Sequence, residues 1–325
     1  MRRHGCRKIA STAGAILALI ACNTCAQQYP TKSIRFLVGF VPGGSVDILA
    51  RDLAAPLTSA LGQSVIVDNR GGAAGLLAAE ATAKATPDGH TILMVIPNHV
   101  IAPSVYAKIP FNTIDDFTPV SLVATAPFMM LVNLGVPAST LKEFIALAKS
   151  RPGQLNYATP GLGSIQHLSH ELLNSMTGIK MVHVPYKGGV PALIDTIAGA
   201  AAITMITTVQ GLPQFKAGKV KTFGVTSLKR AGVLPDVPTL AEAGAPGFES
   251  VVWYGVLAPA KTPKSIVDKL NGEISRILNT REMRERIAQQ GGEVIAGSGE
   301  QFGTLMRSDL KKWAKVAKQA GVRPE

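Results

Sequence analysis

Four glycine-rich turns follow apolar segments of strand length, and each has the composition of an anion-binding loop. The turns occupy residues 40–47, 69–75, 159–164 and 186–189. Glycine lets the backbone approach a ligand, and the N–H groups that open a following helix favour negative charge. The phosphate motif G-x-x-x-x-G-K-[ST] is absent, and Gln166 stands where G-x-G-x-x-G needs its third glycine. The turns therefore predict a cleft for a small anion, without the fingerprint of a nucleotide site.

Catalytic chemistry is less well supported by the residue pattern. Ser164 and His167 lie three residues apart on one helix face, which would suit a serine with a histidine base. The segment is not G-x-S-x-G, however, and no nearby acid would orient the histidine. We therefore predict that the protein is not an enzyme, and a secreted hydrolase is the least favoured alternative.

The same helix carries residue types that can bind a metal. His167, His170 and Glu171 could present ligands on one face, but a further ligand at recognisable spacing is missing. Helix packing or capping is the favoured role, with direct ligand contact as the alternative. Three other histidines stand alone and are interpreted as surface or core residues: His90, His99 and His183. The sequence predicts no metal site and no cofactor.

Strand-length apolar runs alternate with helix-period segments along the chain, which predicts an α/β fold. The first series comprises residues 34–40, 47–61, 65–68, 73–85 and 91–96. The second comprises 128–133, a helix ending near 150 that opens on a capping box at Thr140, then 155–159, 164–176, 181–184, 190–197, 202–207 and 221–226. A strand at 251–257 and helices at 263–278, 281–290 and 301–320 follow. We predict two domains with parallel-rich sheets, the first formed by 27–126 plus 251–325 and the second by 127–250, with the helical tail on the first.

The N-terminus has the three-part layout of a secretory signal peptide. A basic start is followed by an uncharged run at residues 9–21, which is shorter than the roughly 20 residues of a transmembrane helix. Thr24-Cys25-Ala26 then predicts cleavage before Gln27, while Leu19-Ile20-Ala21-Cys22 resembles a lipobox that would leave a lipidated Cys22. Either route predicts export to the periplasm.

Cysteine usage and charge exclude several classes of protein. The three cysteines lie in or beside the leader, so cleavage after Ala26 leaves neither a disulfide framework nor a thiolate site. The formal net charge is +12, but the basic residues are scattered and show no basic-aromatic pattern, so nucleic acid is not an expected partner. A basic surface can steer anions toward a cleft. The lysines at 311, 312, 315 and 318 are interpreted as a solvated helix face.

At these loops the sequence resembles the Bug receptors, the extracytoplasmic solute-binding proteins of tripartite tricarboxylate transporters. The matching segments are 29–35, 42–44 with Asp47, 67–72, 85–89, 116–120, 161–164 with His167 and Leu168, 183–188, 217–219 and 234–239. They span nearly the whole chain after the leader, and their order makes the combination specific.

The resemblance implies a two-domain, type II periplasmic-binding-protein fold that closes around a small organic carboxylate. Contacts from the first domain would come from Gly43, Gly44, Ser45, Asp47, Ala73, Ala74 and Asn98. Contacts from the second domain would come from Gly161, Gly163, Ser164, His167, Tyr186, Lys187 and Gly188. Asp47 also stands near a helix start, so a capping role is the alternative for that residue.

The chain departs from the family pattern after the strand at 202–207. Such receptors often carry an Asp there, whereas residues 205–210 contain no acid and offer neutral contacts such as Thr207. Burying an ammonium group without a partner is costly, so we predict a ligand without an amino group. The predicted function is a monomeric periplasmic receptor that delivers a carboxylate to permease subunits, with a ligand-sensing partner of a signalling system as the alternative.

Overall fold

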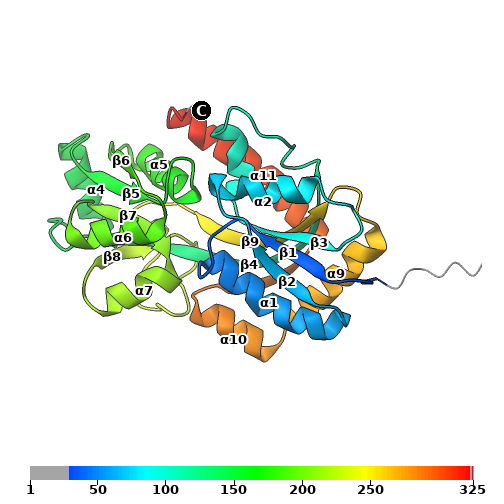
Figure 1. The fold of residues 1–325 in the computed structure, drawn as a ribbon. Helices are drawn as coiled ribbons and strands as arrows, with labels where there is room; N and C mark the ends of the chain where they lie inside the picture. Colours follow the sequence, from blue (N-terminus) through cyan, green and yellow to red (C-terminus); the bar gives the residue numbers. More distant parts are fainter. Residues whose placement is uncertain (1–28, 323, 325) are drawn as a thin grey trace, which may run out of the picture.

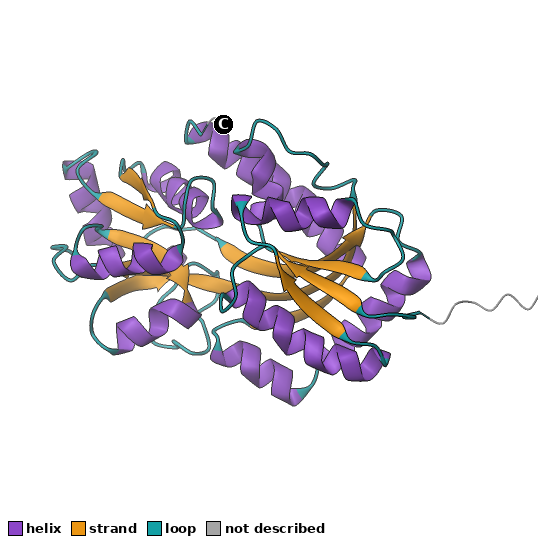
Figure 2. Ribbon diagram, viewed as in Figure 1, coloured by secondary structure: helices purple, strands orange, loops and turns teal. Residues whose placement is uncertain are grey.

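The computed structural model describes residues 29–322 and 324, which form two lobes lying side by side (Figure 1). Each lobe is a sheet with helices on both faces (Figure 2). The predicted leader and its processing sites at Cys22 and Gln27 lie outside the described residues. No helix in the described part of the chain has the length and hydrophobicity needed to cross a membrane.

The first lobe is built on a mixed sheet in the order β2-β1-β3-β9-β4, with β10 also paired to β4. Its strands are β1 (Ile34–Val38), β2 (Val65–Asn69), β3 (Thr91–Val95), β4 (Phe117–Val132), β9 (Val251–Pro259) and β10 (Glu293–Ser298). β1 runs parallel to β2 and β3, whereas β9 is antiparallel to β3 and β4. The predicted parallel pairing is thus found for β1, β2 and β3. It does not extend to β4 and β9, because these strands pass between the lobes and are not joined by a helical crossover.

The second lobe repeats this plan. Its strands are β5 (Asn156–Thr159), β6 (Val182–Pro185), β7 (Ile203–Thr207) and β8 (Lys221–Val225). β5 runs parallel to β6 and β7, and the far end of β4 is antiparallel to β7 and β8. The lobes therefore share one long strand.

That shared strand, β4, is where the sequence prediction was least accurate. Only residues 128–133 were predicted as strand, whereas β4 begins eleven residues earlier, at Phe117. Pro119 and Pro127 argue against a strand in the sequence, because proline cannot donate to a sheet ladder. The structure accommodates Pro119 at a register shift and places Pro127 opposite Val251, just before β4 changes partner at Phe128.

The helices sort onto opposite faces of the sheets. They are α1 (Ser45–Leu61), α2 (Leu76–Ala83), α3 (Asn98–Ile101), α4 (Leu141–Ser150), α5 (Ile165–Thr177), α6 (Gly189–Ala198), α7 (Thr208–Lys216), α8 (Leu240–Ala243), α9 (Lys264–Leu278), α10 (Arg281–Gln289) and α11 (Gly299–Gln319). Two 3₁₀ turns, η1 (Ala73–Gly75) and η2 (Ala102–Ser104), complete the list. In the first lobe α1, α9 and α10 cover one face, and α2 and α11 cover the other (Figure 1).

Five elements were not predicted: α3, η2, α7, α8 and β10. Gly211 and Pro213 weaken the helical signal of α7 in the sequence. The predicted helix at 73–85 is also shorter than expected, because it begins as η1 with Ala73 and Ala74 at φ of 45° and 54°. Positive φ is unusual for alanine, and it marks a backbone that its surroundings hold in place.

The C-terminal helix α11 packs on β4, as the predicted helical tail should, and also contacts α5 in the second lobe. Gly255 leaves room for the Phe302 ring, because a Cβ there would lie 2.1 Å from Phe302 Cζ. Trp253 packs edge-on against the same ring, and its Nε1 donates to Asp309 at 2.7 Å. The tail is thus anchored to the strand that returns from the second lobe.

Candidate functional site

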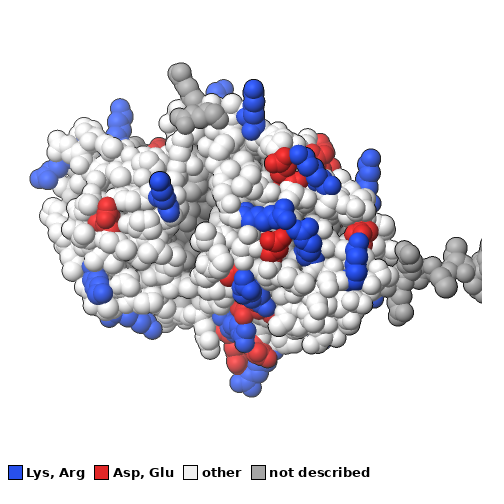
Figure 3. Space-filling view, viewed as in Figure 1, with Lys and Arg blue, Asp and Glu red and all other residues white. Residues whose placement is uncertain are grey.

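The predicted loops gather at the carboxyl ends of the parallel strands, where open α/β sheets bind ligands. In the first lobe Arg70 N–H donates to Val38 O at 2.8 Å, which joins the loops after β1 and β2. In the second lobe Gly188 N–H donates to Pro160 O at 3.2 Å, which joins the loops after β5 and β6. A groove separates the two lobes on the molecular surface (Figure 3).

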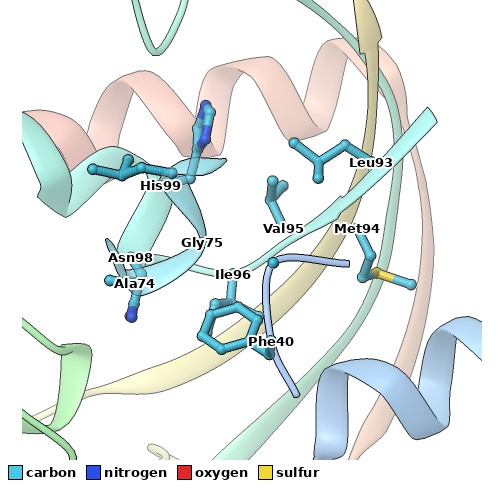
Figure 4. Close-up of a pocket in the computed structure, with 11 residues that line it drawn as sticks. Phe40, Ala74, Gly75, Leu93, Met94, Val95, Ile96, Asn98 and His99 are labelled. Atoms are coloured by element: carbon cyan, nitrogen blue, oxygen red, sulfur yellow. The ribbon is translucent and has the colours of Figure 1, made fainter. Parts of the chain in front are cut away.

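Close backbone packing holds the first-lobe loops in shape. A Cβ on Gly39 would lie 2.5 Å from Gly75 Cα, so the end of β1 touches η1 directly. Beneath these loops a small pocket is lined by Phe40, Ala74, Asn98 and His99, among others (Figure 4). The structure therefore brings two predicted contacts, Ala74 and Asn98, to one pocket.

The buried side chain of Asp47 holds the β1–α1 loop in place through hydrogen bonds. Its side chain is 2% exposed, and its Oδ2 accepts from the Gly43 N–H at 2.9 Å. Arg51 Nε and Asn69 Nδ2 donate to Oδ1 at 3.0 and 2.8 Å. Burial opposes ionisation of Asp47, but the hydrogen bonds from Arg51, Gly43 and Asn69 outweigh it and lower the pKa of the carboxyl group. Its oxygens are thus engaged within the protein, where they hold the turn ahead of α1 without capping the helix itself.

Asp47→Asn should therefore lower the free energy of unfolding by about 1.5–3 kcal/mol, since an amide cannot accept all three donors as a charged group does. Urea unfolding at neutral pH measures this. Asp68→Asn is the matched control, because Asp68 pairs with Arg35 and Arg70 at the surface and should contribute about 1 kcal/mol or less. Equal losses in the two variants would contradict an organising role for Asp47.

Three of the helices that start at the cleft lack an N-terminal side-chain cap. Four helices that begin outside the cleft have a side-chain cap at their N-terminus: α4, α8, α10 and α11. By contrast α1, α6 and α7 begin at the cleft with Gly44, Gly188 and Thr207 as N-caps, and none provides a side-chain cap. α9 begins outside the cleft with Pro263 as its N-cap, and it also has no side-chain cap. Uncapped helix starts leave N–H groups for an anion.

α5 is the cleft helix whose first N–H groups are already satisfied. Ser164 Oγ donates to Gly161 O at 2.8 Å and accepts from the His167 N–H at 3.2 Å. Asn98 Oδ1, from the first lobe, accepts from the Ile165 N–H at 3.3 Å. The predicted contacts Ser164 and Asn98 are thus found together at the start of α5, where they cap it and bridge the lobes.

Gly163 forms a second bridge between the lobes. Its φ is +69°, and a Cβ there would lie 2.4 Å from Val105 Cγ1 in the first lobe. Its N–H donates to His167 Nδ1 at 3.1 Å, so His167 carries no proton on that nitrogen. The sequence predicts Gly163 as a ligand contact but gives no sign of Val105, because no local signal marks a partner 58 residues away.

His167 belongs to a stack of aromatic rings inside the second lobe. Its ring centroid lies 3.9 Å from that of His183, which lies 5.1 Å from that of Tyr157. The centroid of His170 lies 4.5 Å from that of Tyr157. Burial, aided by His183, lowers the pKa of His167 to about 3, and burial lowers that of His183 to about 4. Burial also holds the pKa of His170 well below its usual value. All three rings are neutral at physiological pH.

The possible metal ligands on α5 are engaged in hydrogen bonds. Gly163 N–H occupies His167 Nδ1, Met205 N–H donates to His170 Nε2 at 3.1 Å, and the Tyr157 hydroxyl donates to Glu171. Among the described residues, no three His, Cys, Asp or Glu side chains are arranged to hold a metal ion. His99 is likewise a core residue, with Nε2 2.8 Å from Thr113 O and its ring against Phe111 and Phe117.

The second-lobe side of the cleft is nearly free of acidic groups. The Tyr186 hydroxyl donates to Asp195 at 2.7 Å, which fixes the turn that carries Lys187 and Gly188. Lys187 is exposed, and no ion pair involves it among the described residues. A carboxylate would meet positive charge at this rim of the cleft.

A further pocket lies on the hinge side of the cleft and has walls from both lobes. Two predicted contacts line it, Ser45 at the start of α1 and Thr207 at the end of β7. Its other walls include Thr125, Tyr254 and Gln290, which sequence reasoning did not identify as site residues. The nearby Thr208 hydroxyl donates to Gln290 O, which joins the lobes on this side too.

Comparison with known proteins agrees with this architecture. The family model described as "Tripartite tricarboxylate transporter family receptor" matches residues 49–322. Protein BugT of Bordetella pertussis is 34% identical and is matched over 94% of each chain. A solved R. palustris protein with adipate is 36% identical, with a TM-score of 0.84 over 91% of this chain and 100% of its own. MatC from Rhodopseudomonas palustris, with bound malate, is 34% identical, with a TM-score of 0.79 over 89% of this chain and 100% of its own.

These matches confirm the predicted fold class and the resemblance on which the site prediction rests. The solved relatives share the two-lobed α/β architecture, and the family model spans both lobes. The chain belongs to the tripartite tricarboxylate transporter receptor family of periplasmic solute-binding proteins.

Proposed function

We propose that the protein captures a small organic carboxylate between its two lobes and presents it to the membrane permease subunits of a tripartite tricarboxylate transporter. The observation that carries this proposal is the set of uncapped helix starts, from α1, α6 and α7, at one cleft. Such N-termini favour anions. Adipate and malate in two solved relatives support a carboxylate as the ligand class.

The proposal includes a division into two domains, 27–126 plus 251–325 and 127–250. The change of partner along β4 supports this division, since Pro127 faces β9 and Phe128 faces β7. One chain supplies all the cleft loops, which supports a monomeric receptor. Export with cleavage before Gln27, or with lipidation at Cys22, completes the proposal, and N-terminal sequencing of the mature protein distinguishes the two routes.

We also propose that the protein acts by binding rather than by catalysis. The Ser164 hydroxyl donates to Gly161 O and not to His167, whose Nδ1 is occupied by the Gly163 N–H. A serine nucleophile needs its base within hydrogen-bond reach of the hydroxyl. Incubation of pure protein with a bound carboxylate should therefore return the carboxylate unchanged.

Ligand binding should raise the thermal stability of the protein, because a ligand that binds only the folded state stabilises it by RT ln(1 + [L]/Kd), about 2.7 kcal/mol at a hundredfold excess. A thermal-shift screen of mono-, di- and tricarboxylates should give hits, and small-angle scattering should show compaction. Succinate should bind more tightly than aspartate, since Asp47 is engaged and residues 205–210 offer no acid for an ammonium group. Hits among sugars alone would contradict the carboxylate proposal. Tighter binding of aspartate than of succinate would contradict the prediction that the ligand has no amino group.

A further inference from the structure

The pocket on the hinge side of the cleft, here called the hinge pocket, has walls from five separate segments of the chain. Its lining residues are Ser45, Leu49, Ala124, Thr125, Ala126, Thr207, Val209, Tyr254, Ile287, Gln290 and Gly292. Both crossing strands, β4 and β9, contribute to it. The hinge pocket is therefore bounded by parts that move relative to one another whenever the lobes open or close.

Two uncapped helices, one from each lobe, begin at the wall of the hinge pocket. Ser45 is the first residue of α1, and Thr207 is the N-cap of α7. Neither helix has a side-chain cap, so the N–H groups of both first turns are open to an anion. The start of α5 differs, since Ser164 and Asn98 already satisfy N–H groups there.

The Thr207 side chain gives an independent indication of a ligand. It is 9% exposed and lines the hinge pocket, yet its hydroxyl forms no hydrogen bond within the described part of the chain. Its neighbour Thr208 contrasts with it, since the Thr208 hydroxyl donates to Gln290 O. Because the Thr207 hydroxyl lines the hinge pocket and has no partner in the described part of the chain, it can donate a hydrogen bond to a group that arrives with the ligand.

The walls of the hinge pocket are uncharged, and several are apolar, among them Leu49, Val209 and Ile287. Apolar walls exclude water and strengthen hydrogen bonds from N–H and hydroxyl groups to a carboxylate. No acidic side chain lines the hinge pocket, and the charge of Asp47, in the first turn of α1, is paired with Arg51.

From these observations we infer that the hinge pocket is the carboxylate subsite of the cleft, and that Thr207 and the first turns of α1 and α7 are its donors. The inference rests on the proposed function and deepens it. Binding one carboxylate between two helix starts, one from each lobe, makes the anion itself stabilise the closed arrangement. The subsite fits a carboxylate whose neighbouring carbon bears hydrogen, alkyl or hydroxyl groups and no charge.

Thr207→Val tests the inference, because it keeps the side-chain shape and removes the hydroxyl. Using the tightest binder among adipate, malate and benzoate as the probe, calorimetry should show about 10- to 100-fold weaker binding, the usual effect of one hydrogen bond to a charged group. Thr177→Val is the matched control, since that threonine bonds Leu173 O within α5, and it should bind as wild type does.

A second pair of variants tests the charge of the hinge pocket. Val209→Asp places a negative charge in its wall and should weaken binding of the same probe more than 100-fold. Val182→Asp, at the exposed amino end of β6, should leave binding unchanged. Wild-type affinity in Thr207→Val and Val209→Asp would overturn the inference and leave the proposed function intact. Failure of the wild-type protein to bind any carboxylate would overturn both.

Discussion

Gly163→Ala is expected to weaken ligand binding by about 10- to 100-fold while leaving the ligand-free protein folded. The added Cβ would lie 2.4 Å from Val105 Cγ1 and 2.5 Å from Cγ2, far inside normal contact. Overpacking of this kind costs about 1–3 kcal/mol. Because Gly163 and Val105 belong to different lobes, separating the lobes relieves the clash, so the cost falls on the closed, ligand-binding arrangement. Calorimetry with adipate or malate measures the loss.

Two matched variants separate the clash from other effects of the substitution. Gly178→Ala introduces a side chain at φ of +68°, almost the same backbone conformation, but meets nothing within 4 Å. It should therefore reproduce the backbone strain and leave affinity unchanged. Adding Val105→Gly to Gly163→Ala removes the clashing atoms and should restore most of the binding. Weak binding in the double variant would show that the contact with Val105 is not the cause.

The second large effect is expected from acid. The pKa values of His99, His167 and His183 are lowered to about 4, 3 and 4, each mainly by burial, while the unfolded chain titrates near 6.5. A depressed pKa means that the unfolded state binds more protons, so stability is complete above pH 6.5 and falls as the pH drops toward the folded values. Each such histidine should cost about 2 kcal/mol between pH 7.5 and pH 5.

Urea unfolding at several pH values across this window measures the effect, before most carboxyl groups titrate. His183→Phe is the informative variant, since the ring stacks at the same place and Thr159 keeps its hydrogen bond to Gly161 O. Between pH 7.5 and pH 5 the free energy of unfolding of this variant should fall by about 2 kcal/mol less than that of the wild type, which is the contribution of one histidine. An unchanged slope would mean that His183 is accessible to protons in the folded protein.

Much of the fold could be read from the sequence because the signals are local. Apolar runs and helix periods predicted β1, α1, β2 and β3 to within two residues at each end, and the same holds for most of the second lobe. The first part of β4 was not predicted because it contains prolines, which cannot donate a hydrogen bond in a sheet. The structure tolerates Pro119 because the pairing register shifts there. That register depends on the partner strand, so the local sequence does not reveal it. α7 was missed because Gly211 and Pro213 lower its propensity, while packing on β4 sustains the helix.

The sequence by itself determined that glycine-rich turns follow strands in two α/β series, and the parallel order of these strands placed the turns at one edge of each sheet. It could not say which polar groups remain free, because hydrogen-bond partners lie far apart along the chain. Asp47 is engaged by Asn69 and Arg51, and the start of α5 by Asn98. Only the tertiary structure decided that Thr207 and the starts of α1 and α7 stay open at the hinge pocket. The physical reason is that two strands crossing between lobes bring residues 45, 125, 207, 254 and 290 together, and no local pattern encodes that meeting.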